Sequence, residues 1–311
     1  DAASRSLSIY NRRTHTATDC YTLYYILLRN GVPVEEKNVP MPQLQPGEKA
    51  TITLPIADLP DDAEYTVQME CRLAADTEWA SVGYPMATAE FVLQERAPLP
   101  VLSPSTVDNP SLTQTSGSTR RQVSNSKANV FVLPGNGLLR YMMVGGMVLV
   151  NDSNGDGPMF NSYRWFDNDS GWLATTATGN TSFTANVALA DDAMTGNVTV
   201  ANTSTSCDNT IDYKVYASGE VDMTVTLSPK KADLGRLGVR MNLPGTLRDV
   251  EYYARGPWEN YCDRMAGTYL QRVRTTVDDM YQHYSHPQSN GDHEDLRELI
   301  MVDRVSLDTL V

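Results

Sequence analysis

The stretch 252–299 concentrates side chains of the types that line sugar-binding sites. These are aromatic rings, carboxylates, amides and guanidinium groups: Arg255, Trp258, Glu259, Asn260, Tyr261, Asp263, Arg264, Tyr281, Tyr284, Gln288 and Asn290. Aromatic faces cover the apolar C–H faces of a pyranose, while the polar groups satisfy its hydroxyls once water is removed. The sequence therefore predicts a carbohydrate site in this stretch.

The segment RGPWENY, residues 255–261, is the densest part of that stretch. Gly256 and Pro257 favour a tight turn that presents the three side chains after it, which are Trp258, Glu259 and Asn260. The alternative is structural: an internal charge network formed by Arg255, Asp263 and Arg264, with Tyr261 covering the core. Trp258 fits either a sugar-stacking platform or a plain surface aromatic.

Metal and cofactor chemistry finds little support in the sequence. Three histidines, His283, His286 and His293, lie in a loop-rich segment at spacings that favour solvated side chains over a metal site. The four cysteines form no CxxC pair. The polar run 151–157 reads as a turn rather than a calcium loop, because it lacks the distal glutamate. No cofactor and no metal are expected.

Charge and hydropathy exclude two classes of partner. The chain of 311 residues carries a formal net charge of −13, which argues against nucleic acid, because counterion release needs a cationic surface. No apolar run approaches the roughly 20 residues needed to cross a bilayer. We therefore expect a soluble protein, and the sequence leaves a bacterial periplasm and a cytoplasm equally open.

The elements that must position these residues are strands. Period-2 alternation recurs between Gly, Pro, Asn and Asp turns, and in YTLYYILL one face carries Tyr21, Leu23, Tyr25 and Leu27. The pair Asn30-Gly31 predicts a hairpin turn. Short antiparallel strands at this spacing indicate an immunoglobulin-like β-sandwich over residues 1–96.

A second β region follows a linker. Residues 97–118 hold four prolines and many Ser, Thr and Asn residues, which predicts a linker. Residues 119–311 resume the strand pattern, with turns at 134–137 and at 145–146. So many consecutive strands predict a large two-sheet supersandwich. The fold class is therefore all-β, with two domains.

The motifs RGPWENYxDR and TTVDDMYxxYxxPQxNG resemble the small-chain domain of the family 2 glycoside hydrolases, the β-galactosidases above all. That domain is similar in fold to the aldose mutarotases. Residues 1–95, with YYILLRNG, LQPGEKATITLP and LPDDAEYTVQMECRL, resemble the immunoglobulin-like domain that follows the catalytic barrel in these enzymes.

A third motif, PMFNSYRWFDNDSG at 158–171, resembles the family pattern N-F-W-R-A-P-T-D-N-D. Here Arg164, Asp167, Asn168 and Asp169 stand in the matching places, while Trp165-Phe166 replaces the Ala-Pro-Thr portion. The resemblance makes the first three of these substrate-cleft candidates, together with five residues from the first motif: Arg255, Gly256, Trp258, Glu259 and Asn260.

The resemblance implies a retaining glycosidase that removes terminal non-reducing β-D-galactosyl residues. Such enzymes need two carboxyl groups about 5–5.5 Å apart, and the family carries both on a (β/α)₈ barrel of roughly 200 residues or more. The chain shows no such pattern, so we assign it no catalytic residue and expect the barrel upstream. Its own role would be to shape the cleft, to pack the domains and to contribute to a possible homo-oligomer. The resemblance also implies that the second domain is incomplete and continues past Val311.

Two alternatives come from other classes of function. One is a stand-alone carbohydrate-binding or adhesion module with no enzymatic activity. The other is a mutarotase-like epimerase, which would need a histidine acid and a carboxylate base in one cleft. The sequence does not reveal the exact sugar or linkage.

Overall fold

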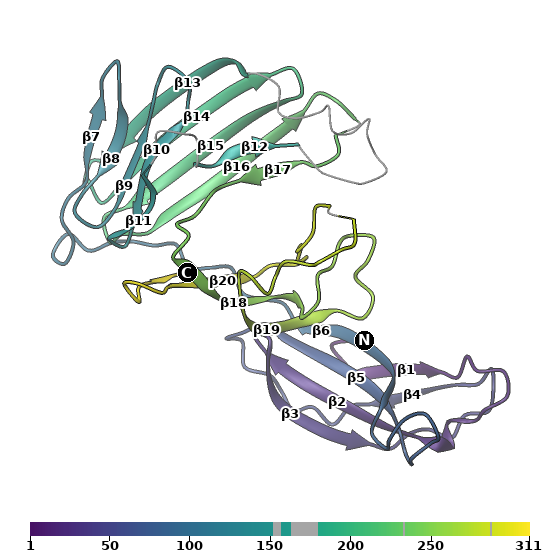
Figure 1. Cartoon of the computed structure of the whole chain (residues 1–311). Coiled ribbons are helices and arrows are strands. Elements are labelled where there is room, and N and C mark those ends of the chain that lie inside the picture. Colours follow the sequence, from purple (N-terminus) through teal and green to yellow (C-terminus); the bar gives the residue numbers. More distant parts are fainter. Residues whose placement is uncertain (152–156, 163–179, 233, 287) are drawn as a thin grey trace.

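The computed structural model describes residues 1–151, 157–162, 180–232, 234–286 and 288–311 (Figure 1). Within these ranges the regular structure is antiparallel strands and one 3-10 turn, Thr18–Cys20, with no α-helix. The all-β prediction is confirmed. None of the described residues forms a helix that could cross a membrane.

The first domain is a sandwich of two sheets. One sheet pairs β1 (Ser6–Tyr10) with β4 (Lys49–Thr53). The other has the order β3-β2-β5-β6, with bounds Val32–Val39, Tyr21–Arg29, Tyr65–Leu73 and Pro85–Gln94. The alternation in β2 is confirmed, because Tyr21, Leu23, Tyr25 and Leu27 are buried on one face. Apolar residues of β5 complete this core.

The predicted β2–β3 hairpin is also confirmed. Asn30 has φ +47° and Gly31 has φ +77°. Positive φ at both central residues is the geometry of the type I′ turn, which matches the right-handed twist of the flanking strands.

The segment predicted to be a linker ends in a strand. β7 (Thr113–Ser116) pairs with β8 (Arg121–Ser124), and Leu112 just before it is 2% exposed in the core of the next sandwich. A short edge strand needs only backbone hydrogen bonds on one side, so its Ser/Thr-rich sequence shows no apolar pattern. The domain boundaries otherwise stay a prediction.

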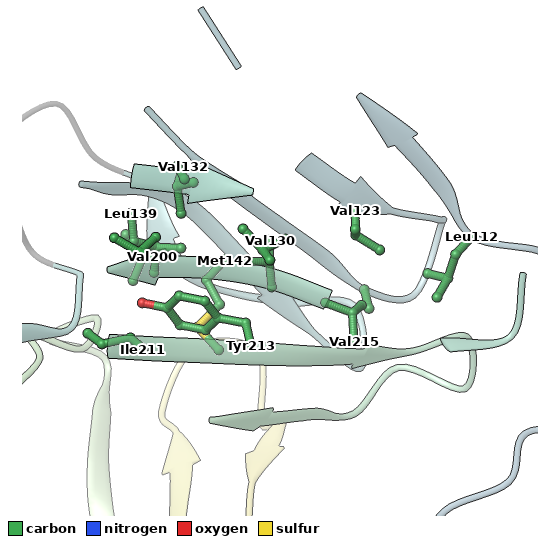
Figure 2. Packing of buried hydrophobic residues seen from close by; sticks show 14 of the residues in the cluster. Leu112, Val123, Val130, Val132, Leu139, Met142, Val200, Ile211, Tyr213 and Val215 are labelled. Atoms are coloured by element: carbon green, nitrogen blue, oxygen red, sulfur yellow. The ribbon is translucent and has the colours of Figure 1, made fainter. Parts of the chain in front are cut away.

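The second sandwich packs a five-stranded sheet on a four-stranded one. The five-stranded sheet has the order β11-β10-β9-β8-β7, in which β9, β10 and β11 span Asn129–Val132, Leu139–Val144 and Met147–Asn151. The other sheet runs β13-β14-β15-β16 over Asn180–Leu189, Thr195–Ser204, Cys207–Tyr216 and Val221–Pro229. Figure 2 shows apolar side chains of both sheets meeting, among them Val130, Met142, Val200 and Tyr213. A short pair, β12 (Met159–Asn161) with β17 (Gly238–Arg240), lies beside them.

A third sheet lies between the two sandwiches in Figure 1. Its order is β19-β18-β20-β21, with bounds Tyr269–Thr276, Leu247–Gly256, Glu298–Asp303 and Thr309–Leu310. Its core residues Val250, Tyr252 and Met301 cluster with Leu149 of β11. The sheet is therefore packed onto the second sandwich by its own apolar face.

Its other side meets the first domain through the β2–β3 turn. The backbone N–H of Arg272 donates to the Gly31 carbonyl at 3.0 Å, and its Nε donates to the Asn30 carbonyl at 3.1 Å. Below the turn, Glu64 is 0% exposed. Its carboxylate accepts from the Tyr253 hydroxyl at 2.6 Å and from Arg297 Nη2 at 3.3 Å. The interface thus combines a close backbone approach with a buried, paired charge.

We expect Gly31→Ala to destabilise the protein more than Gly47→Ala. Both glycines have positive φ, so both variants incur a conformational cost of about 1–2 kcal/mol. A Cβ at Gly31 would also lie 2.5 Å from the Tyr253 ring, whereas Gly47 has nothing within 4 Å. Overpacking adds about 1–3 kcal/mol at Gly31. Urea unfolding of both variants measures the difference, and equal losses would contradict a packed interface.

Candidate functional site

The candidate site begins where β18 ends. Gly256 is buried, and a Cβ there would lie 2.9 Å from the Tyr252 hydroxyl, so this position has little room for a side chain. That hydroxyl donates to the Pro257 carbonyl at 3.2 Å, and the Gly256–Pro257 peptide is cis. β18 ends at Gly256 and the backbone bends at 257–258, so a turn follows the strand, as the sequence predicted.

Asn260 holds the turn closed. Its side chain is 0% exposed. Its Nδ2 donates to the carbonyls of Arg255 and Trp258 at 3.1 and 3.0 Å, and its Oδ1 accepts from the Glu294 N–H at 2.9 Å. Its own N–H donates to the Asp292 carbonyl at 2.8 Å. Asn260 thus joins the turn to the distant segment 292–294, and it has no exposed atom to offer a sugar.

Glu259 joins the turn to a second segment. Its side chain is 7% exposed and pairs with Arg264 Nη2 at 2.6 Å. The same oxygen accepts from the Tyr284 hydroxyl, and the other accepts from the Gly291 N–H at 2.7 Å. Both carboxylate oxygens are therefore occupied by donors within the protein.

These residues form one wall of a pocket of about 320 Å³. Its lining is polar and aromatic: Glu259, Tyr261, Asp263, Arg264, Tyr284, Gln288 and Ser289. Trp258 lies on the same loop and is 69% exposed. The two tyrosine rings can stack on a pyranose, and the exposed carboxylate of Asp263 and the guanidinium of Arg264 can hydrogen-bond its hydroxyls.

Arg255 points elsewhere. Its Nε donates to Asp295 at 2.6 Å, and its Nη1 donates to the Thr268 carbonyl at 3.1 Å. That Nη1 also lies 3.4 Å from Glu90 of β6, whose other oxygen accepts from the Leu270 N–H at 2.7 Å. Arg255 therefore belongs to the interface with the first domain.

The structure thus separates residues that are adjacent in the motif. Glu259 faces the pocket, Trp258 faces solvent, Asn260 and Gly256 are buried, and Arg255 is at the interface. The alternative interpretation, one internal network of Arg255, Asp263 and Arg264, is not what the structure shows. Arg255 pairs with Asp295 and Glu90, whereas Arg264, whose side chain is 55% exposed, pairs with Glu259. The other three candidates, Arg164, Asp167 and Asn168, lie outside the described residues, as does most of the polar run 151–157. Whether any of the eight contacts substrate stays a prediction.

Sequence reasoning missed the residues that support the loop from elsewhere. His293 packs on Tyr252 with a ring separation of 4.5 Å, and its Nδ1 lies 2.9 Å from the Arg255 carbonyl oxygen. Glu90 and Glu64 come from the first domain. In the sequence Glu90 and Glu64 are ordinary polar residues far from the motif, whereas His293 lies in the stretch 252–299 and was predicted to be solvated. The packing of its ring on Tyr252 corrects that prediction. Across the part of the chain that the structure describes, no three His, Cys, Asp or Glu residues cluster as metal ligands would.

We expect Asn260→Ala to destabilise the protein by about 2–3 kcal/mol, because it leaves buried backbone groups without partners. The matched control is Trp258→Ala, whose exposed side chain predicts a change within about 0.5 kcal/mol. Thermal unfolding compares the two variants. Faster amide exchange at Glu294 in Asn260→Ala would locate the effect, and unchanged exchange would show that Asn260 does not hold the loop.

The shifted pKa of Glu90 predicts that the stability of the fold depends on pH. Burial raises the pKa of its carboxyl, against the Leu270 N–H and the Arg255 charge, which lower it. Above its ordinary pKa of 4.5, the folded state therefore holds this proton more tightly than the unfolded state, and the Glu90 contribution to stability falls as pH rises. We expect Glu90→Gln to gain stability relative to the wild type between pH 4 and pH 7 in urea unfolding.

The control for this slope is Glu251→Gln. Hydrogen bonds from Arg274 and then Arg272 lower the pKa of Glu251. Its stabilising contribution is lost as pH falls below the ordinary pKa of 4.5. The free energy of unfolding of the wild type should therefore increase relative to that of Glu251→Gln as pH rises toward 4.5. If the stability difference from the wild type changed with pH in the same direction for both variants, the opposite pKa shifts of Glu90 and Glu251 would be contradicted.

Comparison with known proteins places these observations in a family. The β-galactosidase small chain family matches residues 125–308, and the family described as β-galactosidase, domain 4, matches residues 7–94. A β-galactosidase of Priestia megaterium is 24% identical over 96% of this chain and 29% of its own length. That of Vibrio cholerae is 25% identical over 94% of this chain and 30% of its own length. That of Lactobacillus delbrueckii subsp. bulgaricus is 27% identical over 82% of this chain and 25% of its own length.

The chain thus spans about 30% of the length of the first curated relatives that it matches. The two matched families occupy the first sandwich and the β region after it, in the order in which the structure has them. The chain belongs to the β-galactosidase small chain family and corresponds to the C-terminal portion of a β-galactosidase.

Proposed function

We propose that this chain acts within an enzyme that hydrolyses terminal non-reducing β-D-galactosyl residues with retention. Its own part is to wall one side of the substrate cleft and to hold the packing of the domains. The relatives named β-galactosidase support the enzyme class. The wall role rests on one observation, that the loop after Gly256 carries the exposed Trp258 and lines the polar and aromatic pocket beside Glu259.

The chemistry of the pocket supports a binding role rather than bond cleavage. Retaining hydrolysis needs one carboxyl group that gives and takes a proton and a second that attacks the sugar. Glu259 is engaged at both oxygens by Arg264, Tyr284 and Gly291. A carboxylate held this way keeps loops in place and is not poised to transfer a proton or to attack. Glu259 is therefore not one of the catalytic pair, which we place on a barrel elsewhere in the enzyme, as the family resemblance implies.

Rigidity supports the same role. A wall improves catalysis only if it positions the substrate to within a fraction of an ångström. The loop that carries Trp258 is fixed by Asn260 to segment 292–294 and by Glu259 to Tyr284 and Gly291. The sheet beneath it is fixed to the first domain at Glu64 and Glu90. The exposed side chains of the loop are thus held on a backbone whose motion is restricted by these hydrogen bonds.

The test is Trp258→Ala in the full-length enzyme, assayed with a nitrophenyl β-galactoside. Loss of a stacking contact made equally in ground and transition states raises KM and leaves kcat unchanged. The size of aromatic stacking predicts a rise in KM of about 3- to 10-fold. The purified 311-residue chain should show no turnover of the same substrate.

Trp79→Ala is the matched control, since Trp79 is 63% exposed and lies on the first domain, in the connection between β5 and β6. It should leave KM unchanged. An unaltered KM in Trp258→Ala would remove this loop from the cleft. Turnover by the isolated chain would overturn the proposal that the catalytic groups lie elsewhere.

A further inference from the structure

The outer face of the five-stranded sheet carries a second cluster of polar and aromatic side chains. Val130 and Val132 point into the core and are 0% exposed (Figure 2), so Phe131 between them points outward. Strand register aligns Phe131 with Gln122 on one side and with Tyr141 on the other, and Tyr141 with Asn151. The four side chains form one row across β8, β9, β10 and β11. Three interstrand spacings make the row about 14 Å long.

A β-bulge adds an arginine to this face. Leu139 pairs with Val132 and Tyr141 pairs with Phe131, so Arg140 is an extra residue on β10 without a partner position on β9. In a regular strand Arg140 would point away from its neighbour Tyr141. A bulge places two residues of one strand opposite one of the other and redirects their side chains. Arg140 and Tyr141 accordingly line the same hollow.

A second arginine is held in place by neighbours. The guanidinium of Arg120 lies 4.5 Å from the centre of the Phe131 ring. Its Nη1 donates to Gln122 Oε1 at 3.2 Å, and Gln122 Nε2 donates to Asn129 at 2.8 Å. The cation is thus fixed by stacking and by a hydrogen-bond chain, which reduces the entropy that a ligand must remove on binding.

The charge of this hollow is opposite to that of the chain. Its volume is about 350 Å³, and among the residues that the structure describes its lining includes two arginines and no acidic residue. The whole chain carries −13. Within the described part of the molecule, Arg140 makes no ion pair, and Arg120 has only neutral partners. Two cations without counter-charges favour an anionic ligand.

We propose that this face, formed around Arg120, Arg140 and Tyr141, is a binding subsite for an acidic oligosaccharide. The arginines pair with its carboxylate or sulfate groups, the Tyr141 ring covers a pyranose face, and the amide of Asn151 reaches hydroxyls at the end of the row. The subsite lies on the second sandwich, whereas the pocket beside Glu259 lies at the third sheet (Figure 1). It would hold a charged polysaccharide chain apart from the galactosyl group being cleaved, and its existence does not depend on the proposed wall role.

The experiment is calorimetric titration of the chain with three probes: an oligogalacturonate, a sulfated galactan oligosaccharide and the neutral β-1,4-galactotetraose. We expect the two anionic probes to bind at least about tenfold more tightly than the neutral one, and their affinity to fall as salt is added. The stronger anionic probe identifies whether carboxylate or sulfate is the natural group. Equal affinity for the neutral probe, or no binding of either anionic probe, would overturn the proposal.

The variants are Arg140→Gln and Tyr141→Ala, with Arg274→Gln as control. Arg140→Gln should weaken the anionic probes about tenfold, and Tyr141→Ala should weaken all bound probes about 2- to 10-fold. Arg274 is 87% exposed on β19, so its variant makes the same change in net charge without touching the hollow. Equal losses for Arg140→Gln and Arg274→Gln would show a general charge effect and no site. Thermal unfolding confirms that each variant is folded.

Discussion

The buried carboxylate of Glu64 is the constraint on which the rest of the structure depends. It belongs to the first domain, yet the groups that satisfy it are the Tyr253 hydroxyl on β18 of the third sheet and the guanidinium of Arg297, the residue just before β20. Burial and the neighbouring Glu64 charge raise the pKa of Tyr253, so its hydroxyl keeps its proton and remains a donor. Removing one partner from a buried ion pair costs about 3–5 kcal/mol, whereas the pair itself adds little net stability. Its effect is therefore to specify one docking geometry.

That geometry is transmitted along a single strand. On β18, Tyr253 faces Glu64, whereas Tyr252 lies in the core shared with β11 and packs on His293. Two residues further, Arg255 again faces the first domain. Side chains on alternate faces thus tie one strand to a domain on either side, and the loop after Gly256 inherits a fixed starting direction. Because Asn260 closes this loop with backbone partners only, the pocket is held by groups that a ligand does not need to displace.

Much of the scaffold could be predicted from the sequence because its determinants are local. Alternation in β2 and the Asn30-Gly31 turn depend on neighbouring residues, and both are found in the structure. The edge strand β7 was missed because a strand paired through its backbone alone needs no apolar residues. The partners of Glu64 were missed for a different reason, since Tyr253 is 189 positions away and Arg297 is 233 positions away. A glutamate before a strand looks solvent-exposed until the opposite surface is known.

The candidate sites show where residue type ceases to be informative. Arg255 and Glu259 stand four positions apart in one motif, but the sharp turn at Gly256–Pro257 sends one to the domain interface and the other to the pocket. Residue type and alternation also fail to predict the position of Arg140 on β10, where one extra residue puts Arg140 on the same face as Tyr141. Leu139 and Met142 are both buried in the core, so with strict alternation either Arg140 or Tyr141 would point inward, and an unpaired charge is too costly to bury there. A chain that places an arginine at such a position needs either a partner inside or an irregular strand, and here the bulge supplies the second. At these two places, backbone irregularity therefore decides which polar residues are available to a ligand.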